Sequence, residues 1–403
     1  MMADVTAGRI RGGAGRRAPL GRPWMVGLLV LATGGAACVG ADELAIVAAI
    51  EEGVEALKER QRPDGSWSEQ GHPVGETALA GLALVAGGVR RGHPDVGAAV
   101  RVVRTLSATC RQTYDIALAA MFLDVIGDEA DSERIRDFGR LLAIGQCADG
   151  SWSYQLDRGQ RSGDNSNTQF AALACWICRR HGADLDATLG RVDGYFRATA
   201  NHGPGGWGYK PGNGSTGSMT CAGLVALAAR QGLLFQMARE ANHPVDGEQQ
   251  QDDGPPRQPL AAGGDPVVSE ALAFLGGKLR DSAGGAERRA LYFYWSLERV
   301  GVIYGINLID GVDWYEWGCG TLLRDQRPDG SWEGKGVETS FAILFLARAN
   351  VAADLTAAIE GWAGEKPPAR NGYLRVDRGR KPSGGPAVDG PPAQPDSAPP
   401  PKP

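Results

Sequence analysis

A seven-residue motif occurs three times in this chain, and it constrains the fold more than any other feature. The first copy is Gln-Arg-Pro-Asp-Gly-Ser-Trp at residues 61–67, and similar copies follow at residues 146–152 and 326–332. Each copy separates a charged, helix-forming segment from an almost wholly apolar one. A repeat of this kind is typical of folds that place copies of one supersecondary unit side by side. The recurring residues are Gln61, Asp64, Gly65, Trp67, Gln146, Gly150, Trp152, Gln326, Gly330 and Trp332.

The segments on either side of the motif differ in their hydrophobic periodicity. Residues 42–60 place their apolar side chains on one stripe, which predicts a helix with one face in solvent. Residues 77–86 are apolar on every side, which is typical of a helix that is buried all round. The same alternation recurs in further pairs of segments: 95–108 with 114–126, 129–145 with 167–177, 185–200 with 220–229, 267–280 with 289–302, and 313–324 with 339–349.

These pairs predict six hairpins, each made of an outer and an inner helix. An apolar inner helix needs neighbours on both sides, and a linear stack of hairpins would leave its end repeats uncovered. Closing the stack into a ring removes the ends. We therefore predict an all-α fold, an α/α toroid of about six outer–inner helical hairpins around a central cavity. The toroid domain would cover residues 42–365, with a flexible insert at residues 243–266 that is rich in Gln, Gly and Pro.

The motif residues have structural roles in such a ring. Asp64-Gly65 is a turn dipeptide, in which Gly readily adopts a positive φ after a helix end. Gln61 can hydrogen-bond the free backbone groups of the adjoining helix ends. Trp67 can cover the turn with a large apolar surface. We interpret these residues and their copies as stabilising elements without a chemical role.

The two ends of the chain differ in composition from the repeats. Residues 1–41 combine several arginines, an apolar run and the small residues Val39-Gly40-Ala41, which predicts a cleaved export signal. An uncleaved N-terminal membrane anchor is the alternative, and either reading predicts an exported or periplasmic protein. Residues 366–403 are rich in Pro and Gly, so we expect a disordered tail. The net charge of −5 gives no basic footprint for nucleic acid.

The repeated motif resembles the Gln–Trp motifs (QW motifs) of squalene–hopene and oxidosqualene cyclases, whose toroid is shared by protein prenyltransferase β subunits. Residues 292–301, Tyr-Phe-Tyr-Trp-Ser-Leu-Glu-Arg-Val-Gly, followed by Asp313-Trp314-Tyr315, are similar to exported bacterial prenyltransferase/squalene-oxidase-repeat proteins of unknown role. The resemblance covers roughly residues 42–350 and implies the toroid fold. It implies no single activity, because this superfamily of terpenoid cyclases and protein prenyltransferases includes enzymes and binding domains.

Polar residues recur at the starts of the predicted inner helices, and ring closure would bring these starts together at one mouth of the cavity. Glu76, Asp115, Asn167 and Glu338 occupy equivalent places, with Met219 in the fifth helix. A carboxylate at a helix start is also explained by capping and by the helix dipole. Glu298 would lie deeper in an inner helix, where a structural ion pair is the alternative reading. The predicted cavity-lining residues are Glu76, Asp115, Asp164, Asn167, Tyr294, Glu298 and Glu338, and Tyr292 and Trp295 could add to an amphipathic wall.

The catalytic signatures of the resembled superfamily are missing. The cyclases protonate an alkene with an Asp-x-Asp-Asp motif, and the best match here is Asp164-Asn165-Ser166-Asn167, with Ser166 at the position of the proton donor. A serine hydroxyl is far too weak an acid for that step. The prenyltransferases bind zinc through an Asp-x-Cys pair and a His, and no inner-helix start offers that pair. We therefore predict no metal and no cofactor, and the sequence leaves catalytic activity open.

Three functional hypotheses remain. The first is an exported toroid that binds a lipid, an isoprenoid or an extended partner segment in its central cavity without classical cyclase chemistry. The second is a terpenoid- or lipid-modifying enzyme that uses a non-standard acid such as Glu76 or Glu338. The third is a glycan-active toroid with paired carboxylates.

Overall fold

The computed structural model describes residues 39–242, 264–281 and 290–363. The predicted export signal or anchor lies outside these residues, apart from residues 39–41, which begin the first helix. The predicted disordered tail lies outside them as well, as does the predicted flexible insert up to residue 263. The division of the chain into signal, toroid domain and tail therefore stays a prediction.

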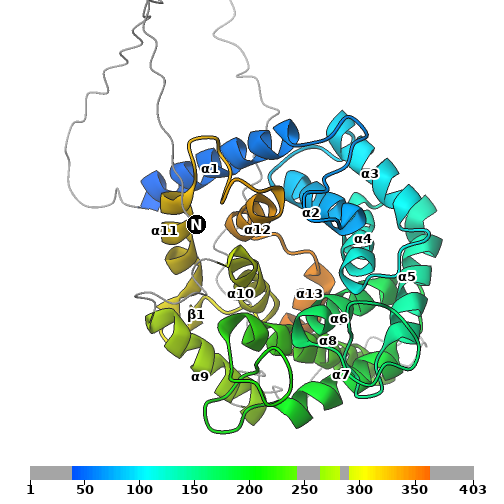
Figure 1. The fold of residues 1–403 in the computed structure, drawn as a ribbon. Helices are drawn as coiled ribbons and strands as arrows, with labels where there is room; N and C mark the ends of the chain where they lie inside the picture. The colour runs from blue at the N-terminus through cyan, green and yellow to red at the C-terminus, as the bar shows by residue number, and fades with distance from the viewer. Residues whose placement is uncertain (1–38, 243–263, 282–289, 364–403) are drawn as a thin grey trace, which may run out of the picture. The chain divides into compact units, whose positions relative to one another are not determined.

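The described residues form six helical hairpins, each pairing an outer helix with an inner one (Figure 1). Every inner helix contacts the next one along the ring, and the last of them contacts the first, so the ring is closed. The predicted α/α toroid is confirmed. The outer helices are α1 (Val39–Glu59), α3 (Pro94–Leu106), α5 (Ser132–Gly145), α7 (Asp186–Thr199), α9 (Pro266–Arg280) and α11 (Trp314–Asp325). The inner helices are α2 (Pro73–Ala86), α4 (Thr113–Ile126), α6 (Asn165–Arg180), α8 (Gly217–Asn242), α10 (Leu291–Ile303) and α12 (Gly336–Leu346).

The inner helices are buried on every side, as their composition predicted. All residues of α6 from Asn165 to Cys178 are buried, and so are residues 115–123 of α4. The outer helices bury only a stripe, such as Val96, Ala99, Val100 and Val103 of α3. Apolar side chains of the outer and inner helices form one continuous hydrophobic core.

The three repeated motifs form equivalent turns, which we name the first, second and third repeat turns (residues 61–67, 146–152 and 326–332). In the first, the Trp67 Nε1–H donates to the Leu57 carbonyl at 3.0 Å, and the Trp67 backbone N–H donates to Thr77 Oγ1 at 3.0 Å. The indole therefore joins the end of an outer helix to the start of an inner one. The same pair of bonds recurs at Trp152, Trp332 and Trp207.

The glutamine of each repeat turn extends the connection to the next hairpin. The Gln61 amide donates at 3.0 Å both to the Gly65 carbonyl and to the Asp95 carbonyl of α3. Gln146 bonds Gly150 and Thr188 in the same way, and Gln326 bonds Gly330 and Ala49. Because α1 carries Ala49, the third turn joins the last hairpin to the first. The glycines adopt positive φ, 90° at Gly65, as expected for a turn that L side chains rarely tolerate.

Three elements depart from the predicted pattern. A two-stranded hairpin, β1 (Leu308–Ile309) with β2 (Val312–Asp313), precedes α11. Helix α8 is much longer than the predicted 220–229 and is the one described helix that is long and apolar enough to span a membrane, but most of it is buried in the ring. A further helix, α13 (Ala353–Ala363), packs on α8 and α10. Its Asp354 bonds Trp176 and Arg180 where α6 ends, so α13 covers that end of the ring.

Candidate functional site

Three of the acids predicted at the ring mouth, Glu76, Asp115 and Asp164, accept hydrogen bonds from backbone amides. Glu76 accepts hydrogen bonds from the backbone N–H groups of Glu69, Gln70 and His72, at 2.6–2.9 Å. These three bonds fix the loop between the first repeat turn and α2. Both carboxylate oxygens of Glu76 are thus used as hydrogen-bond acceptors within this loop.

Asp115 connects two inner helices at the same mouth. Its Oδ1 accepts from the Gly75 N–H of α2 at 2.8 Å, and its Oδ2 lies 3.6 Å from His72 Nδ1. Burial raises the pKa of Asp115 above its usual value, and the Gly75 amide and His72 oppose that rise. Asp115 therefore links α2 to α4 through one backbone hydrogen bond, to Gly75, and one longer contact with His72.

Asp164 caps α6. Its Oδ1 accepts from the Asn167 backbone N–H, and its Oδ2 accepts from the Asn167 side-chain amide, both at 2.9 Å. This is the helix-capping role that the sequence offered as the alternative for the mouth acids. Asp164 and Asn167 thus bond each other, and the first acid of the degraded cyclase motif is held as a cap.

Ser166, at the position of the cyclase proton donor, belongs to a network of hydroxyl groups. The Tyr114 hydroxyl donates to Ser166 Oγ at 2.6 Å, and Ser166 Oγ donates to the Tyr292 hydroxyl at 3.2 Å. The Tyr292 hydroxyl in turn donates to Gln169 Oε1. The network joins α4, α6 and α10 and contains no carboxylic acid.

An aromatic cluster, comprising Tyr114, Phe170, Tyr292, Trp295 and Phe341, lies at the ring centre. Helices α6 and α10 are separated in the ring by α8, so contacts between their side chains cross the centre. Phe170 of α6 stacks on Tyr292 at 6.0 Å between ring centroids and lies 5.6 Å from Trp295. Phe341 of α12 stacks on Trp295 at 5.4 Å. The predicted central cavity is therefore lined and largely filled by aromatic rings.

Two buried ionisable residues, Glu298 and Arg299, follow Trp295 on α10. The Arg299 guanidinium stacks 3.8 Å from the Trp295 ring and 5.2 Å from Phe170, and donates to Ser296 Oγ at 3.1 Å. Its Nε and Nη1 have no hydrogen-bond partner among the described residues, and neither has either oxygen of Glu298. Burial raises the pKa of the Glu298 carboxyl well above its usual value and lowers the pKa of Arg299 to about 10. Both residues line a narrow cavity, together with Leu173 and residues 349–352, which precede α13.

Two of the predicted site residues differ from the rest. Glu338 is half-buried at the start of α12, and burial raises its pKa. Tyr294 stacks on Trp317 of the outer helix α11, at 5.3 Å, and touches Phe345. Tyr294 therefore packs towards the outer layer, because it follows Tyr292 by two residues, which correspond to a rotation of about 200° along a helix. Tyr292 and Trp295 face the centre instead. That the remaining predicted residues line one connected pocket stays a prediction.

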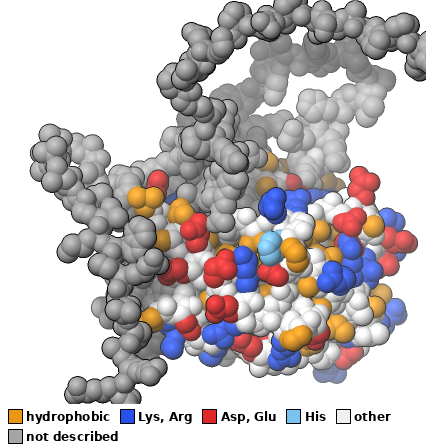
Figure 2. All heavy atoms as spheres, turned by 90° about the horizontal axis from the view of Figure 1, so that it is seen from above, with side chains coloured by type: hydrophobic (Ala, Val, Ile, Leu, Met, Phe, Trp, Pro, Cys, Tyr) orange, Lys and Arg blue, Asp and Glu red, His pale blue; other side chains and the backbone are white. Residues whose placement is uncertain are grey.

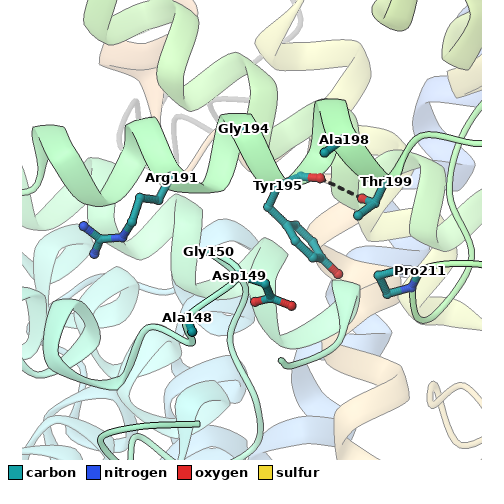
Figure 3. Close-up of a pocket in the computed structure, with 9 residues that line it drawn as sticks. All are labelled: Ala148, Asp149, Gly150, Arg191, Gly194, Tyr195, Ala198, Thr199 and Pro211. Atoms are coloured by element: carbon teal, nitrogen blue, oxygen red, sulfur yellow. Dashed lines mark hydrogen bonds between the residues drawn. The ribbon is translucent and has the colours of Figure 1, made fainter. Parts of the chain in front are cut away.

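No group of three or more His, Cys, Asp or Glu side chains in the described part of the chain is arranged to hold a metal ion. A pocket lies away from the ring centre, between the second repeat turn and α7 (Figure 3). The outer surface around α1 and α3 carries interspersed acidic and basic side chains, without a field of one sign (Figure 2).

Solved structures were compared with this geometry. An arginine-to-alanine variant of the type II terpene cyclase MstE from Scytonema, in complex with geranylgeranyl dihydroxybenzoate, has a TM-score of 0.51 at 14% identity, over 77% of this chain and 99% of that one. An aspartate-to-asparagine variant with the same substrate has a TM-score of 0.50 at 14% identity, over 79% and 100%. The chain has the fold of a type II terpene cyclase. The predicted resemblance is thereby confirmed for the fold.

A further toroid is similar at a lower score. The α-1,6-mannanase GH76A of Salegentibacter sp. HEL1_6, in complex with α-1,6-mannotriose, has a TM-score of 0.48 at 11% identity, over 76% of this chain and 99% of that one. No protein-family model and no curated protein matches the sequence. Because identities of this size show a fold alone, the function must be argued from the side chains of the ring.

Proposed function

We propose that the protein binds an isoprenoid-like apolar chain at the centre of its ring and does not protonate it. The observation that carries this proposal is the aromatic cluster that joins α6, α10 and α12 across the ring. Aromatic faces with a few fixed polar groups are the usual lining of a site for an apolar ligand. The ligand enters at the mouth, where Tyr114 and Tyr292 are half-buried, and replaces ring–ring contacts by contacts with its own carbons.

The polar groups at the mouth support binding without acid chemistry. Protonating an alkene requires a protonated carboxyl directed at the substrate. Glu76 and Asp164 instead accept amide hydrogen bonds, and a hydroxyl network surrounds Ser166. The fold relatives were solved with geranylgeranyl dihydroxybenzoate, which makes a prenyl chain the first ligand class to examine.

Native mass spectrometry and calorimetric titration with geranylgeraniol test the proposal. We expect a one-to-one complex, and Phe341→Ala should weaken binding by roughly ten-fold or more, because a wall of apolar contacts is lost. Phe345→Ala is the matched control, since Phe345 lies on the same helix and packs outward against Trp314 and Tyr315. It should lose stability without changing the affinity. Absence of a complex with the wild-type protein, or equal loss of affinity in both variants, contradicts the proposal.

A second candidate function rests on Glu338. Burial raises the pKa of this carboxyl, which is the condition for a general acid, so a cyclase or isomerase reaction on the same ligand would use Glu338 as its acid. Incubation with geranylgeraniol followed by chromatography of the products tests this function. Turnover that is abolished in Glu338→Gln, with binding retained, would favour the enzyme over the binding toroid.

We also propose that the protein is exported and works near a membrane, on the strength of the N-terminal sequence. Expression with and without residues 1–41, followed by fractionation, tests it. The full chain should reach the periplasm or membrane fraction, and the shortened chain should stay in the cytoplasm. Equal distribution of the two would contradict export.

A further inference from the structure

The pocket outside the ring, with a volume of about 360 Å³, is a groove between the second repeat turn and α7. Residues 148–150 form one wall, and Gly194, Tyr195 and Ala198 of α7 form the other (Figure 3). Pro211 and Thr199 close one end. This size lies within the range of ligand pockets, and neither the aromatic cluster nor the ring mouth contributes to it.

The three repeat turns allow an internal comparison, because each contacts its neighbouring outer helix in the same register. The turn glutamine bonds the carbonyl of Asp95, Thr188 or Ala49. The turn glycine lies against the residue three positions after that carbonyl on the outer helix, which is Ala98, Arg191 or Glu52. The positions six, ten and eleven residues beyond the bonded carbonyl are therefore equivalent in α3, α7 and α1.

The residues around the second turn are smaller than their equivalents. Gly194 corresponds to Arg101 in α3 and to Glu55 in α1. Ala198 corresponds in the same way to Thr105 and Glu59, and in the turn itself Ala148 replaces a proline of the other copies. A Cβ atom added at position 194 would meet nothing within 4 Å. The groove exists because the second repeat lacks these side chains. The other two repeats carry larger residues at the same positions, so the fold itself accommodates them.

The carboxylate at this groove also lacks the cations of its counterparts. Asp329 of the third turn lies 3.8 Å from both Arg327 and Arg60. The hydrogen bonds from Ser66, and beyond them the charge of Arg62, hold the pKa of Asp64 below its usual value. The second turn has Cys147 where the others have arginine, and α7 has Thr199 at the position of Arg60.

Asp149 consequently has no ion pair among the described residues. Its hydrogen bonds from Ser151 both go to one of its two carboxylate oxygens. Its Oδ1 accepts from the backbone N–H and the hydroxyl of Ser151, at 2.9 and 2.5 Å. The guanidinium of Arg191 points away from Asp149 and Tyr195 (Figure 3). The groove thus presents an anionic oxygen next to an aromatic side chain, a combination that suits a guanidinium or ammonium group.

We propose that this groove is the docking site of the basic segment at residues 366–381 of the same chain. Charge complementarity selects it: the segment holds Lys366, Arg370, Arg375, Arg378, Arg380 and Lys381 against one acid, Asp377. It follows α13, which ends at Ala363. Sixteen extended residues reach about 50 Å at ~3.3 Å each, comparable with the diameter of a domain of this size. An arginine of the segment places its guanidinium on Asp149 and its stem along Gly194 and Ala198.

Photo-crosslinking in the full chain tests the docking. Gly194 is replaced by p-benzoylphenylalanine, which the open space at that position accommodates, and the control carries the same residue at Glu55, beside the third turn. After irradiation and digestion, mass spectrometry should identify a cross-link from position 194 to residues 366–381 in monomeric protein, and none from position 55. Thermal melts establish that both proteins are folded.

Charge variants sharpen the result. Asp149→Asn, which keeps an oxygen for Ser151, should lower the cross-linking yield several-fold, and Asp329→Asn should leave it unchanged. The double change Arg375→Glu with Arg378→Glu should lower it likewise. The proposal is overturned if position 194 gives no cross-link, if its cross-link joins two copies of the chain or another segment, or if the yield is indifferent to Asp149.

Discussion

Trp332 at the third repeat turn and Trp295 at the ring centre are both fully buried, but their polar surroundings differ. The Trp332 indole N–H donates to the Leu322 carbonyl at 2.9 Å, and its backbone N–H donates to Thr339. The Trp295 indole N–H has no partner among the described residues. Its neighbours Glu298 and Arg299 also carry unpartnered atoms. The tryptophan of the turn is satisfied and stabilises the ring, whereas the centre retains polar groups that cost stability.

This contrast teaches that burial alone does not identify a structural residue. A buried group whose hydrogen bonds are complete is explained by the fold. A buried group without partners needs another reason for its presence, and such sites are candidates for binding. The following variants test whether the turns and the centre differ as described.

The largest effect is expected for Trp332→Ala. It removes a fully buried indole and the hydrogen bond from that indole to the Leu322 carbonyl of α11, so the free energy of unfolding should fall by about 3–5 kcal/mol. Urea unfolding followed by circular dichroism measures this. A loss below about 1 kcal/mol would show that the repeat turns do not hold the ring together.

A smaller loss is expected for Gln326→Ala, which removes the bonds to the carbonyls of Gly330 and Ala49. Because these bonds join the last hairpin to the first, we expect a cost of about 1–3 kcal/mol. The equivalent change Gln146→Ala, which acts within the ring, serves as the comparison. Unchanged urea midpoints in both variants would contradict the role of the glutamines.

The opposite sign is expected for Glu298→Gln. The folded protein holds this carboxyl protonated to a higher pH than the unfolded chain does, because burial raises its pKa. Wild-type stability is therefore lost as pH rises above the unfolded value of about 4.3. Glutamine does not titrate, so the variant should match the wild type near pH 4 and exceed it by about 1–3 kcal/mol near pH 7. Urea unfolding at both pH values measures the difference, and a variant that is less stable at pH 7 would overturn this account.

The smallest effect is expected for Tyr292→Phe. The variant loses the bond to Gln169 and the acceptor for Ser166 but keeps the aromatic ring, so stability should fall by about 1 kcal/mol or less. Binding of a prenyl chain should change little, since the contacts with carbon remain. Loss of binding larger than the effect of Phe341→Ala would show that the hydroxyl network, rather than the aromatic cluster, selects the ligand.

The ring could be predicted from the sequence because its determinants are local. Six alternations of amphipathic and apolar segments require neighbours on both sides, and the three repeat turns define equivalent connections. Helix α13 was missed, because residues 353–363 carry no repeat turn and their apolar face becomes meaningful only against α8 and α10. The length of α8 was also missed, because its second half is packed by α13.

The candidate site was predicted less well, since it depends on side-chain direction. Tyr292, Tyr294 and Trp295 are close together in the sequence, yet only the first and the last face the ring centre. Glu76 holds the loop that precedes α2, a role that could not be read from its position at a helix start. Phe170 and Phe341 occupy the same position in their helices, five residues after Asn165 and Gly336, but the sequence does not distinguish an apolar residue there from ordinary core.

The sequence by itself determined the number and order of the hairpins and the place of each turn. Hydrophobic periodicity and turn chemistry act over a few residues and can be read along the chain. The tertiary structure decided which aromatic rings meet across the centre and that Glu298 and part of the Arg299 guanidinium find no hydrogen-bond partner among the described residues. It also decided that a groove opens beside Gly194. Each of these depends on helix rotation and on residues distant in sequence, whose proximity exists only when the ring has closed.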